Sequence, residues 1–190
     1  MSEVTKSVQV EQDAKYFIVE AKPFNFTSKG GVVTLSFETN ETWTAKFNDT
    51  PNWVKLSSNS GEGSAELVIT VSDNPSVNNR STQLMIETPI GQALCVPITQ
   101  AARYLTVDTQ TLTFFADGGS TNITVDTDAT FDVSVSDSWL HSNIDNSTIT
   151  ITVDKNVMDS SREGSVVISS IGIIDGNYSI KIPVLQNGKG

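Results

Sequence analysis

Hydrophobic and polar residues alternate along several short segments of the chain. Val33, Leu35 and Phe37 alternate with Thr34 and Ser36, so every second side chain is apolar. Because successive side chains of a β-strand point to opposite faces, a period of two is typical of a strand with one buried face. The same period recurs in segments 43–47, 67–71, 149–153 and 178–184. We therefore expect many short strands that place one apolar face on a core.

Residues that favour turns separate these segments. Glycine, proline, asparagine and aspartate gather at residues 29–31, 59–63, 73–75, 117–119 and 175–177. No segment shows the convincing period of an amphipathic helix. The chain has 20 valines, 15 isoleucines and 22 threonines against nine alanines and nine leucines, which is a composition typical of strands. The sequence predicts an all-β protein.

An internal repeat runs through the chain at an offset of 88 residues. Residues 16–20 (YFIVE) match residues 104–108 (YLTVD), and residues 26–31 (FTSKGG) match residues 114–119 (FFADGG). Self-similarity at a fixed offset indicates that one structural unit occurs twice. After short loop deletions the repeat pairs Trp53 with Trp139, Arg80 with Arg162 and Gln100 with Gln186.

The repeat predicts two homologous modules. We expect an N-terminal arm at residues 1–14, a first module at residues 15–102 and a second module at residues 103–190. Six to eight short strands per module, joined by tight turns, are typical of an immunoglobulin-like β-sandwich. The predicted fold is therefore two tandem immunoglobulin-like β-sandwiches with a short N-terminal arm.

The charge of the chain argues against several classes of partner. Twelve basic and 22 acidic residues give a formal net charge of −10, and no cluster of lysine or arginine could neutralise a phosphate backbone. We expect binding neither to nucleic acid nor to anionic membranes. Since no apolar window of 18 residues occurs, we also expect no insertion into a membrane.

The residues that carry most enzyme chemistry are scarce. The chain has one cysteine, Cys95, and one histidine, His141, so an internal disulfide and a thiolate or multi-histidine metal site are excluded. We expect Cys95, which lies between Leu94 and Val96 in a strand, to be a buried structural thiol. A glycosidase needs two carboxylates held across a cleft, which a sandwich of this size does not offer. We predict a non-enzymatic protein without catalytic residues, cofactor or metal.

Several residues of the first module occur in the order of a known family. They are Phe26, Gly30, Gly31, Trp43, Trp53, Val54, Ser57, the turn 60–63 (SGEG), Asn74, Arg80 and the closing segment 98–100 (ITQ). This order resembles the BACON domain, the Bacteroidetes-associated carbohydrate-binding often N-terminal module. The second module keeps the Gly-Gly pair, Trp139 and Gln186, but has Phe131 in place of the first tryptophan and lacks the SGEG turn. The resemblance implies an immunoglobulin-like fold and a role in binding carbohydrate.

The loop before Trp53 is our candidate for a glycan-binding site. An aromatic ring can stack on the apolar face of a sugar while nearby polar groups bind the hydroxyls, and Trp53 follows Asn48, Asp49 and Asn52. The alternative is that the tryptophans anchor the core. Trp43 is in phase with the apolar residues of its strand, and Trp53 recurs as Trp139, so this alternative is favoured for all three.

Two further sets of charged residues have structural explanations. Asp126, Asp128 and Asp132 form a cluster, but they do not follow the spacing of a calcium-binding loop, so solvated acidic surface is favoured. Arg80 and Arg162 occupy equivalent positions in the two modules. We expect each to bind a carboxylate or loop carbonyl of its own module.

The first fourteen residues lie outside the repeat. They contain an alternating segment formed by Ser7, Val8, Gln9 and Val10. Because an extended segment can add a strand to the open edge of another sheet, we predict that Ser7–Val10 is a partner-binding arm.

Two functions fit these predictions. The first is a structural or adhesive protein on the virion surface of a phage of gut Bacteroidetes, where it would decorate the capsid, contact other virion proteins and aid weak adhesion to glycan or mucin. This hypothesis combines an apparent start at Met1 without a secretion signal, a short tandem with an acidic surface, and the resemblance to a domain of Bacteroidetes. The second is a carbohydrate-binding accessory module of a bacterial surface or secreted protein, from which a leader has been removed.

Overall fold

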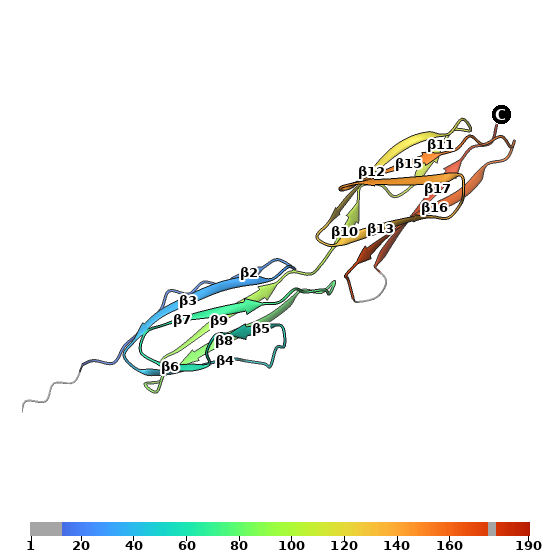
Figure 1. Ribbon diagram of the computed structural model, residues 1–190. Helices are drawn as coiled ribbons and strands as arrows, with labels where there is room; N and C mark the ends of the chain where they lie inside the picture. Colours follow the sequence, from blue (N-terminus) through green and yellow to red (C-terminus); the bar gives the residue numbers. More distant parts are fainter. Residues whose placement is uncertain (1–12, 175–177) are drawn as a thin grey trace, which may run out of the picture. The chain divides into compact units, whose positions relative to one another are not determined.

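The computed structural model describes residues 13–174 and 178–190, and these residues form seventeen strands and no helix (Figure 1). The described chain divides into two compact units, one built around Gly30–Ser72 and Ser81–Thr99 and the other around Gln100–Gly190. The prediction of an all-β protein is confirmed. Each unit contains two β-sheets, which we call the first and the second sandwich.

The first sandwich pairs a four-stranded sheet of order β1-β3-β7-β5 with a five-stranded sheet of order β2-β9-β8-β4-β6. Strand β6 forms on the SGEG turn that the second module lacks, which explains the extra strand. The bounds are β1 Phe17–Ile18, β2 Phe24–Phe26, β3 Gly31–Thr39, β4 Thr42–Phe47, β5 Val54–Leu56, β6 Ser60–Glu62, β7 Ala65–Val71, β8 Arg80–Glu87 and β9 Ala93–Gln100.

The second sandwich repeats this topology, with sheets of order β10-β12-β15-β14 and β11-β17-β16-β13. Its second and last strands, β11 and β17, run parallel, with Leu112 opposite Val184 and Phe114 opposite Gln186. The bounds are β10 Leu105–Val107, β11 Leu112–Phe114, β12 Gly119–Thr127, β13 Thr130–Val135, β14 Leu140–Asp145, β15 Thr148–Val153, β16 Arg162–Ile171 and β17 Ser179–Gln186.

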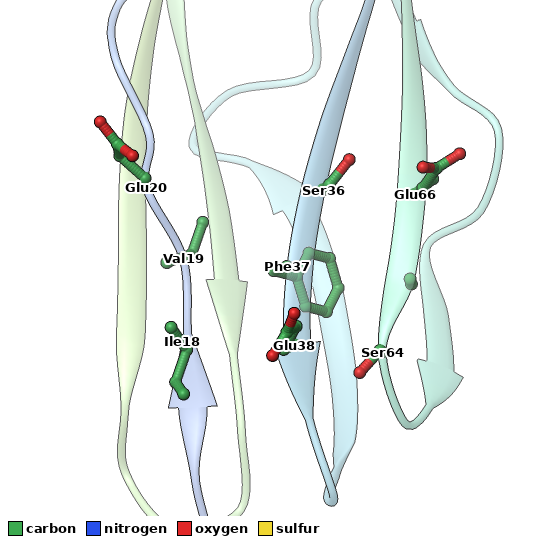
Figure 2. A pocket seen from close by; sticks show the side chains of 9 residues that line it. Ile18, Val19, Glu20, Ser36, Phe37, Glu38, Ser64 and Glu66 are labelled. Carbon is green, nitrogen blue, oxygen red and sulfur yellow. The ribbon is translucent and has the colours of Figure 1, made fainter.

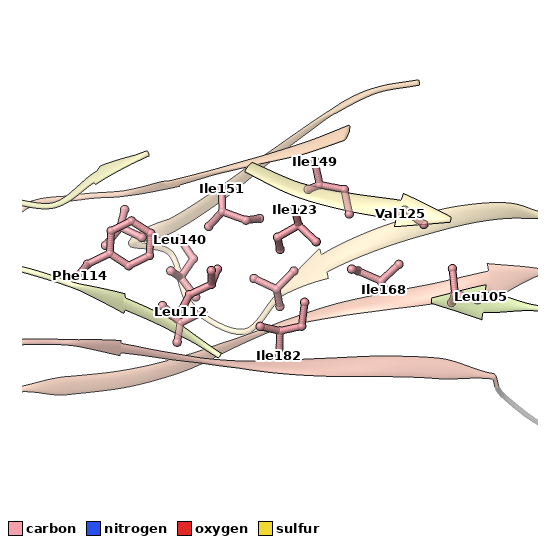
Figure 3. Packing of buried hydrophobic residues seen from close by; sticks show 13 residues of the cluster. Leu105, Leu112, Phe114, Ile123, Val125, Leu140, Ile149, Ile151, Ile168 and Ile182 are labelled. Atoms are coloured by element: carbon pink, nitrogen blue, oxygen red, sulfur yellow. The ribbon is translucent and has the colours of Figure 1, made fainter. Parts of the chain in front are cut away.

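The predicted alternation sets which side chains are buried. In β3, Leu35 and Phe37 are buried while Thr34, Ser36 and Glu38 are exposed. Each sandwich has its own hydrophobic core, to which both of its sheets contribute. Figure 3 shows the core of the second sandwich, where isoleucines and leucines of β10, β12, β14, β15, β16 and β17 pack together. The fold is a pair of immunoglobulin-like β-sandwiches, as the sequence predicts.

The repeated Gly-Gly pair has a steric cause. Gly30 has a φ of +71° and Gly118 a φ of +76°, a conformation that glycine adopts readily and other residues rarely do. A Cβ atom at either position would lie 2.2 Å from a backbone carbonyl oxygen, that of Val71 or Val153. Only glycine therefore fits at the start of β3 and β12, where the chain passes close to the neighbouring strand.

Candidate glycan-binding site

The loop between β4 and β5 is held against the start of β8. The Asn48 side-chain oxygen accepts hydrogen bonds from the Gln83 N–H at 3.0 Å and from the Thr82 hydroxyl at 3.1 Å, and the Asn48 N–H donates to the Gln83 carbonyl at 3.1 Å. The Thr82 hydroxyl also donates to the Asp49 carboxylate. The structure therefore brings Asn48 and Asp49 together, but it uses their oxygen atoms partly to fix the loop.

Trp53 closes the same loop and packs, half-buried, against the first core. Its carbonyl accepts a hydrogen bond from the Ser72 N–H at 2.8 Å. Asn52, the residue before it, is exposed. The loop thus has a polar outer side and an aromatic side chain that anchors it.

A groove of about 560 Å³ lies beside this loop. Of the four residues predicted from sequence, only Asp49 lines it. We call it the loop groove, and its lining residues are Ala45, Lys46, Phe47, Asp49, Thr50, Pro51, Val54, Lys55, Leu56 and Asn59.

The loop groove combines one aromatic ring with several polar side chains. Phe47, at the end of β4, is half-buried, while Thr50, Lys55 and Asn59 are exposed. Lys46 makes an ion pair with Glu87 at 3.0 Å. Sequence reasoning missed these residues for two reasons. Phe47 is in phase with the core positions of β4, and a single exposed lysine in a strand, such as Lys46 or Lys55, is typical of an ordinary solvated strand face.

The other two tryptophans have structural roles. Trp43 is only 4% exposed, meets the Phe37 ring edge-on with centroids 5.3 Å apart and donates from Nε1 to the Gly63 carbonyl at 3.1 Å. This confirms the prediction that Trp43 anchors the core. Trp139 packs against the second core, and the Arg162 guanidinium lies 4.2 Å from the centre of its ring. Such a cation–π contact stabilises both side chains.

Arg80 and Arg162 form the same polar cluster in their two modules. In each, Nε donates to a buried glutamine side chain at 2.8 Å, that of Gln100 or Gln186. In each, Nη2 donates to a loop carbonyl at 2.8 Å. Desolvation lowers the pKa of Arg80, and the charge of Asp73 opposes that shift. The prediction of a repeated structural role is confirmed, and we call each Arg–Gln pair a buried clasp.

The acidic cluster of the second module is held by separate hydrogen bonds. Asp126 accepts the Tyr104 hydroxyl at 3.1 Å, Asp128 accepts the Tyr104 N–H at 3.1 Å, and Asp132 accepts the Val133 N–H at 2.8 Å. The hydrogen bond to Asp126, followed by its charge, raises the pKa of Tyr104. Residues 13–174 and 178–190 contain no group of three histidine, cysteine or carboxylate side chains arranged to hold a metal ion.

The prediction for Cys95 is wrong. Its thiol is exposed, and Sγ lies 3.3 Å from the Gln83 side-chain oxygen. The cause is the strand period, because burial of Val96 and Ile98 in β9 turns Cys95 outward. The predicted partner-binding arm, Ser7–Val10, lies outside the described residues. In the described part of the chain, no helix is long and apolar enough to cross a membrane.

Solved structures with a similar fold include a Bacteroides ovatus GH5 xyloglucanase in complex with a XXXG heptasaccharide, at 19% identity and a TM-score of 0.43 over 46% of this chain. A protein from Bacteroides thetaiotaomicron is 15% identical, with a TM-score of 0.37 over 45% of this chain and 87% of its own. The titin domains Z1Z2 are 13% identical, with a TM-score of 0.43 over 95% of this chain and 100% of theirs. The chain spans only 19% of the length of the xyloglucanase. None of the curated proteins matches the chain.

Fold and surface together define a tandem of immunoglobulin-like modules, each with its own core and buried clasp. The family model that matches both modules is BACON, with the description "Putative binding domain, N-terminal", over residues 37–101 and 127–187. The chain belongs to the BACON family, a family of binding modules.

Proposed function

We propose that the protein is a carbohydrate-binding accessory module, and that the loop groove of the first sandwich holds the glycan. The observation that carries this proposal is the composition of the groove. The half-buried ring of Phe47 offers an apolar face, and the side chains of Asp49, Thr50 and Asn59 offer acceptors and donors for hydroxyl groups. Membership of the BACON family supports a binding role.

The groove is open, so we expect weak binding. Few groups of a sugar would be desolvated, and a dissociation constant near 1 mM corresponds to about −4 kcal/mol. Several copies presented together would raise retention without a deeper pocket. A bacterial surface or secreted protein fits this function. Because neither the family nor the part of the chain that the structure describes points to a virion, the capsid-decoration role is not part of the proposal.

The test compares the loop groove with the loop predicted from sequence. Purified protein, biotinylated at the exposed Cys95 and presented on streptavidin tetramers, is applied to a glycan array and to immobilised mucin. We expect Thr50→Ala combined with Asn59→Ala to abolish retention. Asn52→Ala, outside the groove lining, should leave retention unchanged, and thermal unfolding controls for the fold of each variant.

Each result has a definite meaning. Loss in the double variant alone supports the loop groove. Loss with Trp53→Ala and Asn52→Ala, but not with the double variant, would place the site on the outer side of the loop instead. Absence of retention for the tetrameric wild-type protein on every glycan and on mucin would refute the proposed function.

A further inference from the structure

One sheet edge is closed in the second sandwich by a residue that continues its first strand. Strand β10 pairs with β12 up to Val107 opposite Val125. The next residue, Asp108, donates its N–H to the Thr124 carbonyl at 3.2 Å, and its carboxylate accepts the Thr124 N–H at 3.0 Å. We call the pair of Asp108 and Thr124 the edge clasp. It satisfies the outward backbone groups of β12 at this point.

The same edge is open in the first sandwich. Strand β1 pairs with β3 over two residues only and ends at Ile18 opposite Glu38. In the repeat, Glu20 of the first module corresponds to Asp108 of the second, and Ser36 corresponds to Thr124. Among the described residues, no hydrogen bond joins these two. The chain after Ile18 therefore leaves β3 two residues earlier than its counterpart leaves β12.

A groove occupies the gap that this departure leaves. Figure 2 shows it between the segment that carries Val19 and Glu20 and the strand that carries Ser36. Its volume is about 460 Å³, and a second cavity of about 450 Å³ shares Glu20 and Ser36 and extends along β3 to Thr34. We call the two together the edge groove. It runs along the free edge of β3, and Ile18, which is 60% exposed, lies at one end of it.

Strand β3 offers backbone groups to this groove. From Gly31 to Phe37 it pairs with β7 on one side, and in the described chain it has no strand partner over these residues on the other side. A row of unpaired N–H and C=O groups is a template for an added extended strand. Because the edge clasp occupies the backbone N–H and C=O of Thr124, the corresponding template in the second sandwich lacks this residue, whereas Ser36 remains available in the first.

Three of the four charged side chains along the edge groove are acidic. Glu20, Glu38 and Glu66 line it, and Lys22 at its far end is the one cation among the lining residues. In the described part of the chain, none of these three carboxylates forms an ion pair. The carboxylates that do form ion pairs there are those of Glu41, Glu87, Asp73, Asp117 and Asp154. Attraction between opposite charges across such a groove favours a cationic ligand.

We propose that the edge groove binds an extended peptide rich in lysine or arginine, which adds a strand to β3. Alternate side chains of an added strand point to one face. Basic residues at every second position of the peptide would therefore all meet the carboxylates. The backbone supplies hydrogen bonds, and the carboxylates supply selectivity for charge. This site is separate from the loop groove and does not depend on glycan binding.

Fluorescence anisotropy and amide exchange test the proposal on the full chain. The probes are a fluorescein-labelled nine-residue peptide that alternates threonine with lysine, and a matched peptide with glutamate in place of lysine. We expect only the basic peptide to bind. In the free protein the Ser36 amide should exchange much faster than the Thr124 amide, and the basic peptide should slow exchange at Ser36.

Variants separate strand addition from general attraction to an acidic protein. Glu20→Gln, Glu38→Gln and Glu66→Gln together should weaken binding about tenfold at low salt, as three exposed charge pairs allow. Glu163→Gln, an exposed carboxylate on β16, is the matched control and should change nothing. The proposal is overturned if the basic peptide does not bind, if it binds without slowing exchange at Ser36, or if Glu163→Gln weakens binding as much as the triple variant.

Discussion

Replacement of Gln186 by leucine should destabilise the second module strongly. The Gln186 side chain is fully buried. Its Nε2 lies 2.9 Å from the Asp154 carbonyl and 3.1 Å from the Phe115 carbonyl, and its Oε1 accepts the Arg162 Nε–H at 2.8 Å. Leucine has a similar volume but can make none of these bonds. The variant therefore removes the polar half of the buried clasp and leaves its partners in place.

The cost follows from the groups left without a partner. An unsatisfied buried carbonyl costs about 1–3 kcal/mol, and a hydrogen bond from a charged donor contributes about 1.5–3 kcal/mol. Allowing for the apolar contacts that leucine gains, we expect the free energy of unfolding of the second module to fall by about 3–5 kcal/mol. That is a large part of the roughly 5–15 kcal/mol that stabilises a typical domain.

Urea unfolding followed by circular dichroism measures the loss. Because two modules can unfold in two transitions, Gln100→Leu in the first module identifies which transition belongs to which module. Gln110→Leu, at an exposed position, is the control and should change stability by less than about 0.5 kcal/mol. If Gln186→Leu lowers the free energy of unfolding by less than 1 kcal/mol, the buried clasp does not hold the module together and the reasoning fails.

Three other predictions concern single contacts. Gly61→Ala would place a Cβ 2.5 Å from the Trp43 ring, so we expect a red shift of tryptophan emission and a loss of about 1–3 kcal/mol in urea unfolding. Asp108→Ala should open the edge clasp and speed amide exchange at Thr124; unchanged exchange would contradict this account. Hydrogen bonds from Thr124 lower the pKa of Asp108 in the folded protein below its ordinary value of 3.8. The stabilisation that these bonds give is therefore complete above pH 3.8, and it is lost as the pH falls through the lower pKa of the folded protein. Asp108→Asn should therefore flatten the acid limb of a plot of stability against pH, and an unchanged limb would argue against it.

The fold could be predicted because local patterns and tertiary structure agree. Alternation in β3 placed Leu35 and Phe37 inside, and the Gly-Gly pair recurs because a Cβ at Gly30 would collide with the Val71 carbonyl. The period of two also explains the error at Cys95. Its neighbours in sequence are apolar, but the inward positions of β9 are Val96 and Ile98. The alternation was the better guide than the local hydrophobicity.

The candidate sites depend on arrangements that sequence patterns do not contain. The loop groove takes Phe47 and Asn59 from positions twelve residues apart in the sequence. They come together because β6, which begins directly after Asn59, pairs with β4. The open edge depends on where β1 leaves β3. Glu20 and Asp108 are both acidic and occupy equivalent positions, so the sequence gives no reason to expect that only Asp108 caps its neighbouring strand.

The parallel pairing of β11 with β17 has a mechanical consequence. A force that draws the two ends of the second sandwich apart would pull these strands along their length in opposite directions. Their inter-strand hydrogen bonds lie across that direction, so all of them are loaded at once in shear, whereas a hairpin pulled from its open end breaks one bond at a time. We therefore expect such a module to resist extension better than one in which the two loaded strands form a hairpin.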